Sequence, residues 1–149
     1  MKTRTLLITT VLLSVVTVII TGGAKREIHV DEVIKALSHT WVNPDLSQTT
    51  MASQKLVVKP DGFIDPYLNV DDSLDKPVLP MRYTINEAWI DRERNIWFKA
   101  TINHMTGKIY SLNKLSNTGT EWEYIWSYGD LPDQIDADEQ KYRIYYRQE

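Results

Sequence analysis

Beyond residue 40, apolar and polar side chains alternate along the chain with a period of two. Ile96, Phe98 and Ala100 share one face of such a segment. Trp97 and Lys99 lie between them, on the opposite face. This alternation is typical of a β-strand that buries one face. The same pattern predicts eight strands, over residues 40–45, 53–59, 62–68, 81–91, 95–103, 107–115, 120–127 and 141–147.

The connections between several of these strands are tight turns. The segment 59–62 reads Lys-Pro-Asp-Gly, which places proline and glycine where a β-turn favours them. At Arg94-Asn95 the asparagine is expected to adopt the positive φ. Turn residues at 95, 107 and 119 are 12 positions apart, which is too short for a helical crossover. The strands are therefore predicted to be antiparallel, each beside its neighbour in sequence.

A sheet of eight such strands exposes two unpaired edges unless it closes on itself. We therefore predict a mainly β fold, an eight-stranded antiparallel up-and-down barrel, with a two-sheet sandwich as the alternative. One short helix precedes the strands, because Val30, Val33, Ile34 and Leu37 recur at helical spacing. We interpret this helix as a brace against the sheet.

The first 24 residues have the pattern of a targeting segment. Lys2 and Arg4 precede an uncharged, largely aliphatic stretch over residues 5–24, which ends in Gly-Gly-Ala. Small residues at that point predict a signal peptide cleaved after Ala24, and an uncleaved membrane anchor is the alternative. The chain is thus divided into residues 1–24 and a domain over residues 25–149. We expect the domain to be exported (secreted, periplasmic or at the cell surface) and membrane-anchored only through residues 5–24 if these are retained.

Composition limits the range of partners. The chain of 149 residues has a net charge of −3, and the part after the targeting segment is more acidic still. A nucleic-acid partner is disfavoured, because phosphate binding needs a basic surface. The absence of cysteine excludes disulfides, thiolate metal sites and a cysteine nucleophile.

Sequence motifs give no support for catalysis or metal binding. His29, His39 and His104 do not have the spacing of metal ligands. The chain has no glycine-rich phosphate loop and no Gly-x-Ser-x-Gly motif, and its acidic segment 71–75 lacks the glycine and glutamate of a calcium-binding loop. We expect a protein that is not an enzyme and holds neither a metal nor a cofactor.

Several short motifs appear in an order that resembles the lipocalin-like group of small exported bacterial proteins. Trp41 lies on the first strand, the segment 55–63 runs into a Pro-Asp-Gly hairpin, Trp89 lies on the fourth strand, and the chain ends in a basic, aromatic strand. The resemblance implies a β-barrel, and eight strands enclose an interior just wide enough for side chains or one small ligand. It also implies that Trp41 closes the bottom of the barrel, with a basic residue of the last strand, Arg143 or Arg147, packed over it.

Aromatic side chains provide most of the candidate site. Tyrosine and tryptophan suit ligand cavities, although they also fill the cores of β-barrels. Glu87 is expected on the same face as Tyr83 and Trp89, where a carboxylate could hold the polar end of a ligand; a β-bulge near Ala88 would instead turn it outward. The candidate residues lining the interior are Tyr83, Glu87, Trp89, Phe98, Tyr110, Trp122, Tyr124, Trp126 and Tyr142.

Two functional hypotheses follow, and an enzyme that uses a cavity-lining acid such as Glu87 ranks behind both, because no base, nucleophile or metal cluster supports it. The first is an exported, non-catalytic protein that binds a small, partly apolar molecule inside the barrel. The alternative is a cell-surface module with a filled core that contacts a protein or a glycan through outward-facing residues, for which Trp97, Ile125 and Tyr145 are candidates.

Overall fold

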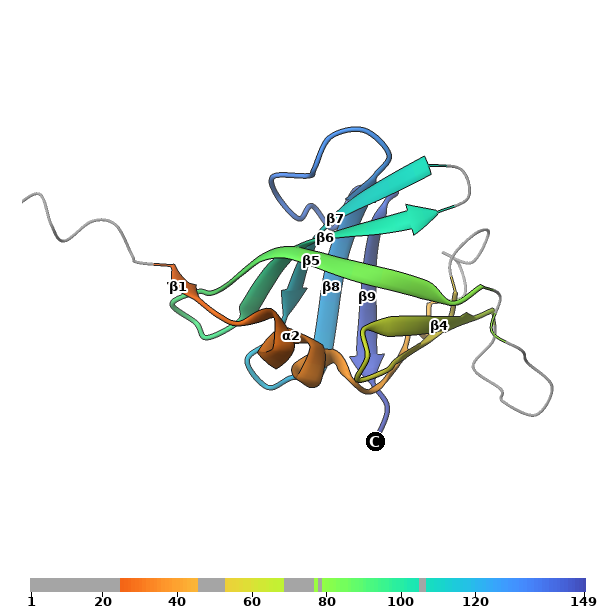
Figure 1. The fold of residues 1–149 in the computed structure, drawn as a ribbon, viewed down its shortest axis with the longest axis horizontal. Helices are drawn as coiled ribbons and strands as arrows, with labels where there is room; N and C mark the ends of the chain where they lie inside the picture. Colours follow the sequence, from red (N-terminus) through yellow and green to blue (C-terminus); the bar gives the residue numbers. More distant parts are fainter. Residues whose placement is uncertain (1–24, 46–52, 69–76, 78, 105–106) are drawn as a thin grey trace, which may run out of the picture.

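The computed structural model describes residues 25–45, 53–68, 77, 79–104 and 107–149. Within these residues the chain forms a β-barrel with one short helix (Figure 1). The elements are β1 (Arg26–Glu27), α2 (Val30–Leu37), β2 (Thr40–Val42), β3 (Lys55–Val58), β4 (Phe63–Tyr67), β5 (Met81–Ile90), β6 (Ile96–His104), β7 (Gly107–Leu115), β8 (Glu121–Ser127) and β9 (Tyr142–Arg147).

The eight strands from β2 to β9 form a closed antiparallel barrel. Each pairs with its neighbour in sequence, and β9 returns to pair with β2, as Trp41 opposite Arg147 shows. The predicted barrel and its order are therefore confirmed, and the sandwich is excluded. The sequence pattern missed β1, which pairs with the end of β5 through Arg26 and Glu27. A strand of two residues is too short to show any periodicity.

Helix α2 lies at one end of the barrel and packs into its core (Figure 1). The predicted helix is confirmed, and its apolar residues Val33 and Leu37 are buried. Trp41 on β2 fixes the helix by donating a hydrogen bond from Nε1 to the carbonyl oxygen of Leu37, at 2.8 Å. Gly62 in the β3–β4 turn adopts a φ of +82°, and Ile34 packs beside it, so the turn and the helix close this end together.

The turn between β5 and β6 differs in one detail from the expectation. Arg94, not Asn95, has the positive φ, at 68°. Asn95 is buried, and its backbone and side-chain amides donate to the Asp91 carboxylate at 2.9 and 3.0 Å. The asparagine is therefore needed for its hydrogen bonds, and the exposed residue before it, Arg94, adopts the left-handed backbone conformation.

The half of the barrel next to α2 is filled by a cluster of aromatic rings around Trp122. This residue is fully buried, and its ring lies 5.7 Å from Trp41, 6.0 Å from Tyr83, 5.5 Å from Tyr124 and 6.1 Å from Tyr145, between centroids. The closed half is therefore a packed core without space for a ligand.

The predicted targeting segment, residues 1–24, lies outside the described residues. Among the residues that are described, no helix has the length and apolar character needed to cross a membrane.

Candidate functional site

The open half of the barrel contains a cavity of about 320 Å³. It lies at the end opposite α2, where the connections β2–β3, β4–β5, β6–β7 and β8–β9 leave the strands. Most of its lining is apolar. The lining residues are Ser53, Leu56, Ile64, Pro66, Leu68, Leu79, Met81, Tyr83, Ile102, Ile109, Ser111, Tyr124, Trp126, Tyr128, Arg143 and Tyr145.

Three tyrosines form the base of this cavity, where it meets the packed half. The rings of Tyr124 and Tyr145 are nearly parallel, with an interplanar angle of 9° and centroids 5.9 Å apart. Tyr145 donates its hydroxyl hydrogen to the carbonyl oxygen of Ser53 at 2.5 Å. Tyr83 lines the same base and interacts there with the Ser111 side chain. The base of an otherwise apolar cavity therefore carries phenolic hydroxyls in fixed positions.

A buried polar network supports this base from the side of the closed half. Asn113 is fully buried and donates from Nδ2 to Ser111 Oγ at 2.9 Å and to the Phe98 carbonyl at 3.3 Å. Its Oδ1 accepts from Trp122 Nε1 at 3.2 Å. Because each polar group has a partner, the network orients Ser111 and Tyr83 without the cost of an unpaired buried group.

Arg143 contributes the positive charge at the cavity. It lies on β9 and donates from Nη1 to the carbonyl oxygens of Gln140 and Tyr142, at 2.7 and 2.6 Å. These bonds use one nitrogen of the guanidinium group, which has five N–H donors in total. A half-buried guanidinium beside tyrosine hydroxyls gives the cavity one polar side that can bind an acceptor or an anion.

The tyrosines at the base stay protonated. Burial raises the pKa of Tyr83 and of Tyr145 well above the usual value of 10.0. Burial also raises the pKa of Tyr124, and the hydrogen bond with Tyr145 and the positive charge of Arg143 only partly oppose this. The hydroxyls therefore act as neutral donors and acceptors at every physiological pH.

Alkaline pH is expected to destabilise the fold through these tyrosines. Their stabilising contribution is complete below pH 10, the value at which unfolded tyrosine ionises. It is lost as the pH rises further, at roughly 1.4 kcal/mol per pH unit for each tyrosine that remains protonated in the fold. Urea unfolding at pH 8 and pH 11 measures the loss of unfolding free energy. In Tyr145→Phe this free energy should decrease less steeply with pH. An equal slope in that variant would contradict the assignment.

Five of the nine candidate lining residues point into the barrel. Tyr83, Tyr124 and Trp126 line the cavity. Phe98 and Trp122 also point inward, but both are fully buried in the packed core, which places them away from any ligand.

Glu87 and Trp89 lie on the outer face of the barrel, so their prediction as cavity residues is wrong; the alternative given for Glu87, a β-bulge that turns it outward, is what the structure has. Opposite β6, the register shifts between Ile85 and Glu87, which leaves Asn86 as the additional residue of a β-bulge. The bulge exchanges the faces of all later residues of β5. Glu87 is consequently half exposed and bonded to Lys99 at 2.6 Å, and this bond lowers its pKa below the usual range.

Tyr110 and Tyr142 also lie outside, contrary to the prediction. Tyr110 pairs with Ser127 and shares its face with Leu112, which belongs to an apolar cluster on the outer wall. Tyr142 donates its hydroxyl hydrogen to Glu123 on that wall at 3.1 Å. On β7 the prediction placed the more apolar set of alternating residues inside the barrel, but the inward-facing positions include the polar residues Ser111 and Asn113.

The residues expected to close the barrel occupy different ends of it. Trp41 is fully buried at the closed end, and Arg147 is its register partner on β9, so both side chains point to the same face there. Arg143 lines the cavity in the open half. Of the two arginines, Arg147 therefore has the position beside Trp41.

Sequence reasoning missed several cavity residues, and Tyr145 is the most important. The sequence predicts the opposite face for Tyr145, because Tyr142, Ile144 and Tyr146 form the more apolar set on β9. The signal that could have located it was Arg147. Side chains two positions apart on a strand lie on the same face, so Tyr145 must face the same way as Arg147, which was expected to pack over Trp41. Ile109 and Ser111 on β7 were also missed, because the alternation on that strand predicted the opposite face as the inner one.

The outward-facing residues considered for a contact surface are not together. Tyr145 points inward, and Ile125 is buried in the outer cluster with Leu112. Trp97 remains half exposed on the outer wall, next to Trp89. Among the described residues, no group of three or more histidine, cysteine or acidic side chains could hold a metal ion.

Comparison with known proteins adds no relative from which function could be transferred. No family model matches the sequence, and neither the curated proteins nor the solved structures contain a significant match. The candidate sites therefore rest on the geometry of this chain.

Proposed function

We propose that this protein is an exported, lipocalin-like binding protein that takes one small, partly apolar molecule into the open half of its barrel and does not catalyse a reaction. The observation that carries the proposal is the cavity of about 320 Å³, which lies at the lower limit of small-molecule sites, at roughly 300–1,000 Å³.

The lining favours a ligand with an apolar body and one polar end. Leu56, Ile64 and Ile102 belong to the apolar wall, whereas Tyr83 and Arg143 supply hydrogen bonds on one side. An apolar body gains from leaving water, and a hydrogen-bond acceptor on the ligand satisfies groups that would otherwise need water.

The same lining supports a role in binding without chemistry. Among the residues that the structure describes, those that line the cavity include no histidine, carboxylate, lysine or cysteine. Its tyrosines are held protonated by burial, so none of them serves as a base near neutral pH. The alternative, an interaction module, requires a filled core, whereas among the described residues the half around Trp122 is packed and the open half contains the cavity.

Native mass spectrometry of protein purified from its own host is expected to detect one copy of a small organic molecule per chain. The molecule should dissociate under denaturing conditions, because the described lining residues include no cysteine, lysine or histidine to attach it covalently. The mass of the denatured chain also tests export, since cleavage after Ala24 removes the first 24 residues. A protein that is always empty would contradict the binding proposal and favour the interaction module.

A further inference from the structure

A second hollow, of about 480 Å³, lies on the outside of the barrel. Its floor contains Trp89, Trp97 and Leu112, and Leu131 and Pro132 from the β8–β9 connection line its side. Trp89 and Trp97 are register partners on β5 and β6. Their ring planes differ by 8°, and their centroids are 6.3 Å apart. We call this hollow the outer-wall pocket; it shares no lining residue with the inner cavity.

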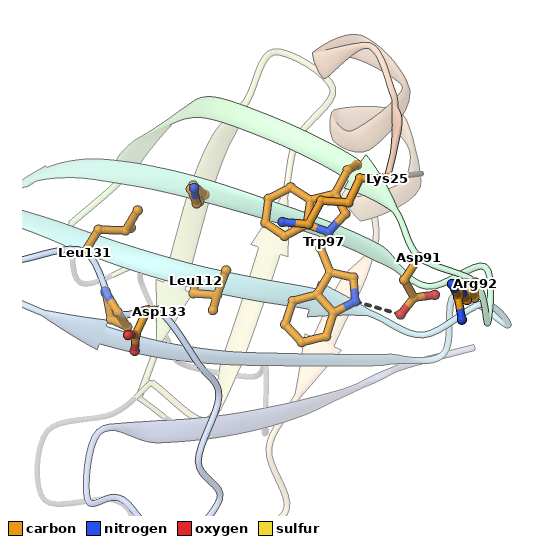
Figure 2. A pocket seen from close by; sticks show the side chains of 10 residues that line it. Lys25, Asp91, Arg92, Trp97, Leu112, Leu131 and Asp133 are labelled. Atoms are coloured by element: carbon orange, nitrogen blue, oxygen red, sulfur yellow. Dashed lines mark hydrogen bonds between the residues drawn. The ribbon is translucent and has the colours of Figure 1, made fainter. Parts of the chain in front are cut away.

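The position of the Trp97 ring is fixed by Asp91. The indole Nε1 donates to Asp91 Oδ2 at 2.8 Å, as Figure 2 shows, and Asn95 donates to the same carboxylate. Partial burial of Asp91 raises its pKa, but these hydrogen bonds outweigh that effect and hold the pKa below its usual value. The carboxylate therefore stays charged and keeps the indole in one orientation, which reduces the entropy lost when a ligand binds.

The rim of the pocket carries charges of both signs. Trp97 lies between Asp133 on one side and Arg92 on the other, with Lys25 nearby (Figure 2). Lys25 Nζ lies 4.5 Å from the centroid of the Trp89 ring. None of the three charged residues forms an ion pair within the described part of the chain. Hydrogen-bond donors and an acceptor are thus available around an aromatic floor.

This combination fits a saccharide better than other ligand classes. The C–H groups on one face of a pyranose ring pack on an indole, and its hydroxyls both donate to a carboxylate and accept from an ammonium or guanidinium group. An acyl chain gains nothing from the charged rim. A nucleic acid is disfavoured, because the chain has a net charge of −3 and phosphate binding needs an extended basic surface.

We propose that the outer-wall pocket binds a neutral saccharide, with one pyranose ring stacked on Trp97 and its hydroxyls bonded to Asp133 and Arg92. The proposal is independent of the inner cavity, because the two hollows open on opposite faces of the sheet. Lys25 closes one side of the site, since its ammonium group lies over the neighbouring indole.

Two trisaccharides test the site: cellotriose and triacetylchitotriose, whose equatorial substituents leave flat C–H faces. The full-length chain is titrated with each, in a detergent without a sugar headgroup. The indole N–H signals of Trp89 and Trp97 are recorded by NMR. We expect both signals to shift and that of Trp126, which lines the inner cavity, to stay unchanged.

Variants separate contact with the sugar from an effect on folding. Trp97→Ala should weaken binding about tenfold or more. Because Trp97 also packs against the outer apolar cluster, Asp133→Ala is the second variant; its side chain is exposed, so we expect weaker binding with unchanged stability. Tyr146→Ala is the matched control, since it removes an exposed aromatic side chain of β9 outside the pocket.

The proposal is overturned if neither trisaccharide shifts the Trp97 signal, or if Asp133→Ala and Trp97→Ala both bind with the affinity of the unmodified chain. A shift confined to Trp126 would also overturn it, because the sugar would then occupy the inner cavity. Failure of this test leaves the mass-spectrometric test of the inner cavity unaffected.

Discussion

Replacing Trp122 by alanine is expected to lower the free energy of unfolding by about 3–5 kcal/mol. The side chain is fully buried and contacts four other aromatic rings, so its removal leaves a cavity that the closed barrel cannot collapse to fill. The substitution also removes the hydrogen bond from Nε1 to Asn113 Oδ1 and leaves that oxygen buried without its donor. Urea unfolding followed by circular dichroism measures the change.

Trp122→Phe is the matched control. It keeps most of the aromatic volume and loses the hydrogen bond, so a smaller loss of stability is expected. Since small domains are stable by only about 5–15 kcal/mol, the alanine variant should lose a large part of the total. A loss below about 1 kcal/mol in the alanine variant would mean that the rings around Trp122 do not form the core.

Replacing Ile109 by tryptophan is expected to abolish ligand uptake while the barrel stays folded. Ile109 and its register partner Ile102 both line the inner cavity, so a larger ring at this position occupies the space that a ligand needs. Because the cavity is open, the additional volume enters free space and costs less than the roughly 1–3 kcal/mol of overpacking a closed core. Binding of anilinonaphthalene sulfonate, an apolar fluorescent anion, should weaken at least about tenfold.

Tyr110→Trp provides the control, since it enlarges the adjacent residue of the same strand. Successive residues of a strand point to opposite faces, so this ring is added outside the barrel and probe binding should be unchanged. If both variants bound the probe as the unmodified chain does, the inner cavity would not be the site. If only Tyr110→Trp lost binding, the probe would bind to the outer wall.

The sequence located the strands because strand formation depends on local information. Alternation and turn residues gave strands over 81–91 and 107–115, and the structure has Met81–Ile90 and Gly107–Leu115. The short spacing between turns then left next-neighbour antiparallel pairing as the only simple arrangement. Closure followed, because an open sheet of this size exposes two edges.

The face of each residue was predicted less well than its strand. On β5 the prediction holds as far as Ile85 and fails from Glu87 onward, because a bulge at Asn86 changes the phase. Such a bulge leaves the composition of a strand unchanged, so the sequence offered it as an alternative near Ala88 but could not decide whether it is present. On β7 the outward-facing Leu112 packs with Ile125 and Ile135 in an apolar cluster on the outer wall. The outer face of this strand is therefore as apolar as its inner face, and the sequence pattern does not distinguish the two.

The sequence by itself determined that this chain forms an antiparallel barrel preceded by a short helix, because periodicity, turn residues and connection lengths are local properties. Only the tertiary structure decided which side chains line the inner cavity and that Trp89 and Trp97 form the floor of a second pocket. Inside and outside depend on strand register, on the bulge at Asn86 and on the packing of the β8–β9 connection over the outer wall. These features arise from contacts between segments distant in sequence, so the pattern along one strand cannot specify them.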